Sequence, residues 1–172
     1  MMGISQSYIS RLEKRIITQL KKDIEKIVCE KLANTSYFLV DVTVSNDNNI
    51  VVEIDSFEFV DIDFCIALSR EIEQHYDREV EDFDLEVGSA GLSAPFKVEQ
   101  QYQKNIGKEV EVLTKKGEKI IGTLLSSTFD SFCLQYEKLE KQEGCKRKTK
   151  VLHETTFEKE NIKYIKHLIR FK

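Results

Sequence analysis

The chain has 172 residues, of which 41% are hydrophobic and 33% are charged, and its formal net charge is −4. This length fits one medium domain or two small ones, and the composition is that of a folded rather than a disordered protein. The sequence lacks an apolar run of the ~20 residues that a membrane helix needs. Its start lacks the apolar core of a signal peptide, so we expect a cytoplasmic protein without membrane contact. The four cysteines are scattered without a CxxC pair, which predicts reduced thiols.

Charge is distributed unevenly along the chain. Residues 1–96 contain nine Lys and Arg against nineteen Asp and Glu, a net charge of −10. Residues 97–172 contain seventeen against eleven, a net charge of +6. The change coincides with the stretch "GSAGLSAPF", which is rich in helix breakers and therefore indicates a domain boundary. The predicted divisions are an acidic domain 1–88, a linker 89–96 and a basic domain 97–172. The residues that mark the linker are Gly88, Gly91, Leu92 and Pro95.

The first half opens with a helix signal followed by a hairpin signal. Apolar residues recur at three- and four-residue spacing from Ile9 to Val28, which predicts a helix that ends near Asn34 and Thr35. Two β-branched runs around "NDNN" predict a β-hairpin over residues 37–57. Simple alternation in the first strand would place four apolar residues on one face, namely Phe38, Val40, Val42 and Val44.

A second helix is predicted after the hairpin, with Asp61 or Asp63 as its N-cap. The segment "DFDLEV" then supplies a short third strand. The order α-β-β-α-β predicts a two-layer domain with both helices on one face of a three-stranded sheet. The apolar stripe of the second helix consists of Phe64, Cys65, Leu68, Ile72 and Tyr76.

The second half changes to the periodicity of strands. Apolar residues alternate from Val110 to Tyr136, with turn signals at "KKGE" and "STFD", and two further strands fit "TKVLHETTF" and "NIKYIKHLIRF". Short strands at this spacing predict a small β-barrel, so the whole chain is placed in the α+β class. Gly122 marks either the bend that closes this barrel or a plain β-bulge. Phe129 and Phe132, near a turn, suit stacking on unpaired bases but also suit the core.

The sequence offers no catalytic motif. His75, His153 and His167 are far apart, without the spacing of a zinc site, and neither GxSxG nor a GxxxxGK[ST] loop is present. We therefore predict a protein that is not an enzyme and that needs no cofactor or metal. Gly88–Gly91 matches the GxxG loop with which KH domains clamp a nucleic-acid backbone. Here that stretch follows a strand and has no cation close by, which favours the linker interpretation.

Groups of cations in the second half predict contacts with RNA phosphates. One group ends the segment 137–151, and another surrounds the "KKGE" turn. A second interpretation is that the 137–151 segment is only a solvated hairpin loop, because glutamates accompany its lysines. A further cationic group follows in the last strand. The residues predicted to contact RNA are Lys115, Lys116, Lys119, Lys146, Arg147, Lys148 and Lys150. The additional group comprises Lys163, Lys166, Arg170 and Lys172.

Three stretches together resemble one known family. "DLEVGSAGLSAPF", "VVEID" followed by "DIDFCIALSREIEQ", and "IGKEVEVLTKKGEKIIGTLLS" are similar, in this order, to the RimP family of bacterial ribosome maturation factors. Within the second stretch Asp55, Cys65 and Ser69 stand at matching positions. The family often has Asp and Arg before the proline, where this chain has Ser93 and Ala94. A contact made by that Arg is therefore missing or relocated.

The resemblance implies an N-terminal α/β domain, a C-terminal Sm-like (SH3-like) barrel, and a non-catalytic role in maturation of the small ribosomal subunit. The charge division adds a physical mechanism, since the acidic domain suits a basic ribosomal protein and the basic domain suits rRNA. The expected partners are thus the immature 30S subunit, rRNA and a basic small-subunit protein, bound by a monomer. The alternative is an Sm-like RNA-binding regulator of small RNAs or messages. Such proteins usually form rings, which the acidic domain and long loop would obstruct.

Overall fold

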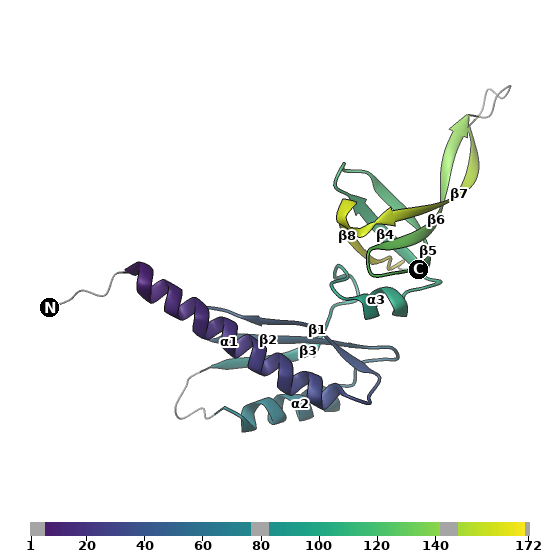
Figure 1. The fold of residues 1–172 in the computed structure, drawn as a ribbon. Helices are drawn as coiled ribbons and strands as arrows, with labels where there is room; N and C mark the ends of the chain where they lie inside the picture. Colours follow the sequence, from purple (N-terminus) through teal and green to yellow (C-terminus); the bar gives the residue numbers. More distant parts are fainter. Residues whose placement is uncertain (1–5, 77–82, 142–147, 171–172) are drawn as a thin grey trace. The chain divides into compact units, whose positions relative to one another are not determined.

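The computed structural model describes residues 6–76, 83–141 and 148–170. The chain divides into two compact units, Met1–Ala90 and Gly91–Lys172 (Figure 1). Each unit has its own sheet and its own hydrophobic core, so each is described in turn. Within the described residues, no helix combines the length and the apolar character that crossing a bilayer requires.

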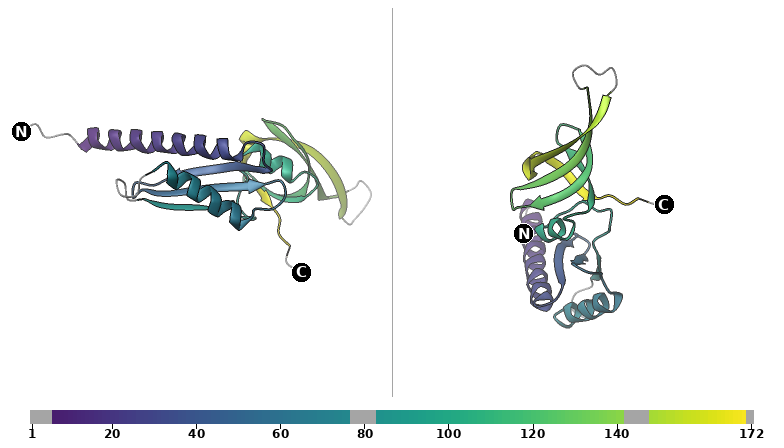
Figure 2. Two further views of the ribbon diagram at one scale, coloured as in Figure 1. Left: turned by 90° about the horizontal axis from the view of Figure 1, so that it is seen from below. Right: turned by 90° about the vertical axis from the view of Figure 1, so that its right-hand side faces the viewer.

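The N-terminal unit has the predicted order of elements. They are α1 (Gln6–Leu32), β1 (Tyr37–Val44), β2 (Asn49–Ser56), α2 (Ile62–Gln74) and β3 (Asp84–Ser89). The sheet order is β1-β2-β3, with β1 antiparallel and β3 parallel to β2, so α2 forms the crossover between two parallel strands. Both helices lie on the same face of the sheet (Figure 2, left), as the sequence pattern predicted.

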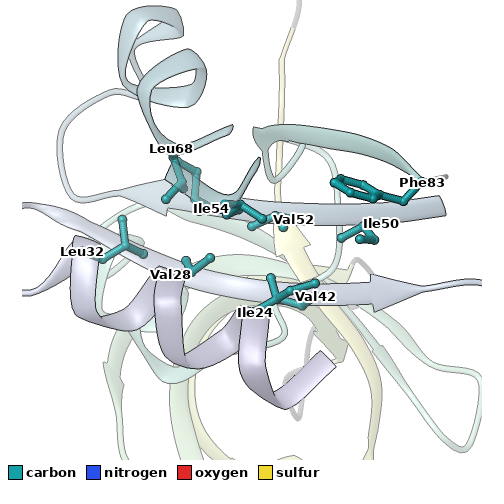
Figure 3. Close-up of a cluster of buried hydrophobic side chains, with 10 residues drawn as sticks. Ile24, Val28, Leu32, Val42, Ile50, Val52, Ile54, Leu68 and Phe83 are labelled. Carbon is teal, nitrogen blue, oxygen red and sulfur yellow. The ribbon is translucent and has the colours of Figure 1, made fainter. Parts of the chain in front are cut away.

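The core of this unit lies between the sheet and the two helices (Figure 3). Only the C-terminal half of α1 contributes to it, because its earlier apolar residues Ile9, Leu12 and Ile16 remain exposed. Both α1 and α2 are amphipathic, and burying their apolar stripes against one sheet face stabilises all five elements together. The buried members of this core are Ile24, Val28, Leu32, Val42, Ile50, Val52, Ile54, Leu68, Ile72 and Phe83.

One detail of the predicted β1 pattern is wrong. The pairing of β1 with β2 shifts register between Leu39 and Asp41, which is the signature of a β-bulge. A bulge adds one residue to the strand and therefore exchanges the two faces beyond it. Leu39 consequently packs on the core together with Val42, whereas Phe38 contacts the ring of Phe57, with the two centroids 5.2 Å apart.

Local signals at the ends of the helices act as predicted. Asn34, after the last turn of α1, adopts a positive φ of 64°, a conformation that asparagine tolerates well. Asp61 is the N-cap of α2, and its carboxylate accepts a hydrogen bond of 3.2 Å from the Asp63 amide. Val60, just before the cap, and Cys65 both pack against the core, which fixes the direction in which the chain enters the helix.

The C-terminal unit is a five-stranded antiparallel sheet preceded by a short helix. Its elements are α3 (Glu99–Lys104), β4 (Glu109–Thr114), β5 (Lys119–Ser127), β6 (Ser131–Lys141), β7 (Lys148–Glu158), a 3-10 turn η1 (Lys159–Asn161) and β8 (Ile162–His167). The sheet order is β7-β6-β5-β4-β8. No strand pairing joins β7 to β8 within the described part of the unit, so the predicted barrel is not closed by hydrogen bonds. The β6–β7 hairpin extends beyond the other strands (Figure 2, right).

Helix α3 was not predicted, because its sequence "EQQYQK" has too few apolar residues to show a helical period. The buried Gln101 explains why it forms here: its side-chain oxygen accepts hydrogen bonds from the amides of Lys97 and Val98 at 2.7 and 3.4 Å. Tyr102 of α3 then packs on the core, with its ring 6.0 Å from that of Phe132. The buried members of this second core are Val110, Val112, Leu124, Phe132, Leu134 and Ile165.

Gly122 in β5 is required by a close approach of neighbouring atoms. A Cβ at this position would collide with the carbonyl oxygen of Gln135 and would lie 2.9 Å from Cβ of Tyr136 and 3.0 Å from Cγ of Leu134. The glycine therefore lets β6 press against β5 at this point. The actual register shift between these strands lies further along, between Leu124 and Ser126.

Candidate nucleic-acid interface

Lys115 and Lys116 lie in the tight turn between β4 and β5. Gly117 allows this turn because it adopts a positive φ of 88°, and its amide donates a 3.0 Å hydrogen bond to the Thr114 carbonyl. The Lys115 amide donates a 2.9 Å hydrogen bond to the carbonyl of Asn161, which joins the turn to the start of β8. Both lysine side chains are exposed, and within the described residues neither has an ion-pair partner. The turn therefore presents two free cations on a fixed backbone.

Lys119, predicted to contact RNA with these two lysines, is already engaged. Its Nζ lies 2.9 Å from Oε2 of Glu111, a carboxylate whose side chain is only 8% exposed. The Tyr164 hydroxyl donates a 2.8 Å hydrogen bond to Oε1 of Glu111, and Lys166 Nζ lies 3.5 Å from the same oxygen. The hydrogen bond from Lys119, helped by Tyr164 and Lys166, holds the pKa of Glu111 below its ordinary value despite burial. The same hydrogen bond raises the pKa of Lys119. Lys119 and Lys166 therefore share the counter-charge of one buried carboxylate, and neither is a free cation.

The predicted 137–151 loop is only partly within the described residues. Lys146 and Arg147 lie outside them, and Lys148 is described only as the first backbone position of β7. Lys150 lies in β7 itself, where its Nζ donates a 2.7 Å hydrogen bond to Oε2 of Glu137 on β6. Exposed ion pairs of this kind still exchange partners readily, so Lys150 is a weaker candidate rather than an excluded one.

The last cationic group separates in the same way. Arg170 Nη2 lies 2.6 Å from Oε1 of Glu109, and Lys172 is outside the described residues. Lys163 is exposed near the start of β8 and has no ion-pair partner in the described chain. Thr114, the last residue of β4 before the β4–β5 turn, pairs with Ile162 of β8. Lys163 is the next residue of β8, so it lies near that turn. Three free lysines, Lys115, Lys116 and Lys163, therefore belong to one end of the β4–β8 pair; we call them the lysine cluster.

The linker residues occupy two different structures. Gly88 lies in β3, opposite Glu53 of β2, and Ser89 ends that strand, so β3 runs one residue into the predicted linker. Gly91 begins a turn in which the Ala94 amide donates a 2.9 Å hydrogen bond to its carbonyl. Neither glycine adopts a positive φ, so a left-handed backbone conformation does not require glycine at either position. The exposed side chain of Leu92 lies within this turn.

Pro95 has a specific structural task. It forms a β-bridge with Lys166, and the amide of Phe96 donates a 2.8 Å hydrogen bond to the carbonyl of Ile165. These contacts cover the outer edge of β8 over the residues involved. A covered edge does not pair readily with a strand from another chain, which is how many sheets avoid uncontrolled association.

Two surface features were not recognised in the sequence. The first is a basic portion of the otherwise acidic unit: Arg11, Lys14 and Arg15 are all exposed on α1. Charge counted per domain obscured this segment, and a count per helix would have found it. The second is a group of apolar side chains, neighbours in sequence after β2, that are 45–75% exposed. Its signal in the sequence is a set of apolar residues that fall outside the predicted apolar stripe of the second helix. The members of this β2–α2 patch are Phe57, Phe59, Ile62 and Ile66.

The described residues also bear on metal and thiol chemistry. No group of three or more His, Cys, Asp or Glu among them could hold a metal ion. Cys29, Cys65 and Cys133 are free thiols in the structure, and Cys145 lies outside the described residues. Burial, with a smaller contribution from nearby carboxylates, raises the pKa of Cys29 and Cys65, so neither is activated as a nucleophile.

Fold and surface together define an α+β protein with two sheets and a cluster of free lysines on the second. Comparison with known proteins makes the assignment more specific. The profile of the RimP N-terminal domain matches residues 27–93. A ribosome maturation factor RimP of Porphyromonas gingivalis is 40% identical over 149 residues, which cover 87% of this chain and 98% of that protein. The corresponding proteins of Christiangramia forsetii and Flavobacterium psychrophilum are 39% and 33% identical, over 78% and 77% of this chain and 88% and 86% of their own lengths. The chain belongs to the RimP family of ribosome maturation factors.

Proposed function

We propose that this chain is a non-enzymatic ribosome maturation factor that binds the immature 30S subunit and assists its assembly. In this proposal the C-terminal unit, an open variant of the Sm-like module, contacts rRNA. The acidic N-terminal unit contacts a basic small-subunit ribosomal protein. Membership of the family supports the biological role. The observation that carries the RNA contact is the lysine cluster, whose side chains are exposed and unpaired within the described chain.

The lysine cluster suits phosphate because its positions are fixed while its charges are free. A lysine engaged by a carboxylate must break that ion pair before it can bind RNA, which reduces its net contribution. Lys119 and Lys150 are engaged in this way, so we assign them a smaller part than the sequence suggested. Lys146, Arg147 and Lys148 remain predicted RNA contacts on the strength of the sequence alone. Each phosphate contact adds affinity without reading the base sequence.

The β2–α2 patch supports the contact with a basic protein. Its apolar residues alternate with Glu58, Asp61 and Asp63, so the surface is both hydrophobic and negatively charged. Large exposed apolar patches mark interaction sites, and their charged rims select the partner. Phosphate is repelled by such a rim, whereas a protein surface rich in Lys and Arg is attracted. A short connection between the two units would then let each contact raise the effective concentration of the other.

The alternative, an Sm-like regulator that assembles into rings, fits the second sheet less well. Ring assembly joins edge strands of neighbouring subunits, so both edges of the sheet must be accessible. One of these edges, that of β8, is already occupied by Pro95 and Phe96. This arrangement favours a monomer. Sedimentation of the purified protein separates the two proposals, because a ring would have several times the mass of one chain.

Binding to ribosomal particles tests the main proposal. The wild-type protein should co-sediment with free 30S particles and be scarce on 70S ribosomes. Replacing Lys115, Lys116 and Lys163 together with Gln should weaken binding to 30S particles at least tenfold. It should also flatten the salt dependence, since each lost phosphate contact removes roughly one unit from the logarithmic slope. Lys150→Gln is the matched control and should change both quantities much less.

Two results would contradict the proposal. Equal occupancy of free 30S particles and translating ribosomes would argue against a maturation role. Wild-type binding by the triple variant, at both low and physiological salt, would show that the RNA contact lies elsewhere. The variants themselves should fold normally, because substitutions of exposed side chains usually change stability by no more than about 0.5 kcal/mol.

A further inference from the structure

The turn between β5 and β6 holds the most exposed aromatic side chain of the described chain. Phe129 exposes 87% of its surface, whereas Phe132, three residues later, exposes 1% and belongs to the core. The turn around Phe129 is closed by hydrogen bonds. The Thr128 amide donates to the Ser131 carbonyl at 2.8 Å, and the two hydroxyl groups lie 2.9 Å apart. The Phe129 ring is therefore exposed to solvent on a turn whose backbone is fixed by hydrogen bonds.

Lys159 fixes this turn from beneath. Its ammonium group donates hydrogen bonds to the Thr128 carbonyl and to the Glu99 carboxylate, and its amide donates a 2.8 Å hydrogen bond to the carbonyl of Asp130. The backbone is thus held on both sides of Phe129. The Lys159 side chain is only 19% exposed, and its Nζ lies 4.0 Å from the ring centre of Tyr102. These contacts order the turn before a partner binds, so binding costs the turn less conformational entropy.

Glu99 completes the support and neutralises Lys159. Its carboxylate also accepts hydrogen bonds from the Ser127 hydroxyl at 2.8 Å and from the Gln103 amide group at 3.0 Å. Burial by itself would raise the pKa of Glu99, but the hydrogen bonds from Lys159, Ser127 and Gln103 outweigh it and lower that pKa. Glu99 is therefore ionised at neutral pH, and the charge of Lys159 is used within the protein.

A shallow hollow beside Phe129 is lined mainly by carboxylates. The lining residues are Phe129, Asp130, Glu158, Lys159 and Glu160. Glu158 accepts a 2.9 Å hydrogen bond from the Asn161 amide group, while Asp130 and Glu160 have no ion pair within the described residues. Because Glu99 neutralises Lys159, the free charge of the hollow is negative. An exposed aromatic face next to carboxylates is chemically suited to a cation.

We propose that the Phe129 turn binds a cationic side chain, best an arginine, of a basic protein segment. The guanidinium group would stack on the Phe129 ring while its N–H groups reach Asp130 or Glu160. Arginine suits this site better than lysine because its planar group can stack and donate two hydrogen bonds at once. The inference rests on the proposed function and adds to it a protein contact on the unit otherwise assigned to RNA.

A nucleobase is the less suitable occupant of the same ring. A base stacked on Phe129 would bring its flanking phosphates close to the carboxylates that line the hollow, and like charges repel. Proteins that bind single strands surround their stacking rings with cations instead. The residues of the lysine cluster belong to the β4–β5 turn and the start of β8, and none of them lines this hollow.

Peptide and oligonucleotide probes can distinguish the two occupants on the full-length protein. The probes are a short labelled peptide of alternating glycine and arginine, the same peptide with lysine, and labelled oligouridylate. Phe129→Leu keeps an apolar side chain but removes the aromatic face, and should weaken the arginine peptide roughly three- to tenfold. Phe129→Tyr should bind nearly as wild type. Asp130→Asn with Glu160→Gln should weaken the same peptide and reduce its salt dependence. Oligouridylate binding should not respond to Phe129→Leu.

Tyr8→Leu provides the matched control, because it removes another exposed aromatic ring, on α1 of the other unit. The inference is overturned if Phe129→Leu binds the arginine peptide as well as wild type does. It is also overturned if that variant loses oligouridylate in the same proportion, since the ring would then be a base-stacking platform. An unchanged thermal midpoint shows that the variants are folded. The proposed function fails separately, through the lysine cluster variants on 30S particles, so the two ideas can be told apart.

Discussion

The two units bury their interiors in different ways. The N-terminal unit covers one sheet face with two amphipathic helices, and nine of the ten buried residues in its described core are aliphatic. Within its described residues, the C-terminal unit has one short α-helix, α3, and its smaller core is surrounded by the rings of Phe96, Tyr102, Tyr136 and Phe157. It also buries the charged Glu111 and the polar Gln101. Because less apolar surface is covered by helices in this unit, we expect hydrogen-bond networks and close strand contact to carry more of its stability.

The largest expected effect tests the aliphatic core. Ile24 is fully buried in α1, so Ile24→Ala should lower the free energy of unfolding of the N-terminal unit by about 4 kcal/mol, through lost burial and the cavity left behind. Ile9→Ala, on the exposed part of the same helix, is the control and should cost far less. Hydrogen exchange resolved by residue is the measurement. Equal loss of protection in β4–β6 would show that the two units do not unfold separately.

The next effect concerns close strand contact. Gly122→Ala should destabilise the C-terminal unit by about 3 kcal/mol, because the new methyl group meets backbone and side-chain atoms of β6 that cannot move away easily. Gly88→Ala, in β3, meets no atom within 4 Å and should be nearly neutral. Chemical denaturation of both variants measures the difference. A tolerated Gly122→Ala would mean that β5 and β6 can separate here without cost.

The buried charge is expected to contribute less. Glu111→Ala should destabilise the C-terminal unit by about 2 kcal/mol, since it leaves the Tyr164 hydroxyl without its acceptor and Lys119 beside Lys166 without their counter-charge. Glu118→Ala, an exposed residue of the neighbouring turn, is the control. The folded-state pKa of Glu111 is lowered, so its stabilisation is present at neutral pH and is lost as acid titrates the carboxylate. A variant with the same acid unfolding curve as wild type would contradict this role.

The sequence predicts the elements of the first unit better than their register. Hydrophobic periodicity and capping residues were sufficient to predict α1, α2 with its N-cap Asp61, and the order of the elements along the chain. The bulge at Leu39 and Asp41 could not be predicted, because its signal is a mismatch between two strands rather than a pattern within one. Helix α3 was not predicted for a related reason. Its start is stabilised by the buried side chain of Gln101, which accepts hydrogen bonds from the preceding amides, and not by apolar residues at helical spacing.

The candidate site shows the same limit for charges. Counting residues identified the cationic half, but it could not distinguish Lys115, which is free, from Lys119, which is paired with Glu111. Their separation in sequence is small, and only the strand pairing decides which lysine meets a buried carboxylate. The sequence likewise could not distinguish Phe129, which is exposed, from Phe132, which is buried. The turn geometry places the first in solvent and the second in the core.

The smallest effect should appear only in alkali. Burial, with a smaller contribution from Glu99, raises the pKa of Tyr102 to about 12, whereas an unperturbed tyrosine ionises near 10. The unfolded chain therefore loses its proton first, so stabilisation that is complete below pH 10 is lost as the pH rises towards 12. Tyr102→Phe keeps the ring beneath Lys159 and removes the ionisable hydroxyl. It should make the C-terminal unit lose less stability than wild type between these two pH values.

Tyr8→Phe, on the exposed start of α1, is the control for this measurement, because it removes a phenol of the other unit. Apart from the two tyrosines, wild type and both variants contain the same ionisable side chains. The difference between Tyr102→Phe and wild type therefore isolates one phenol. If the two curves coincide from neutral pH to pH 12, water reaches the Tyr102 hydroxyl in the folded state, and the support beneath the Phe129 turn is less dry than its contacts with Lys159 and Phe132 indicate.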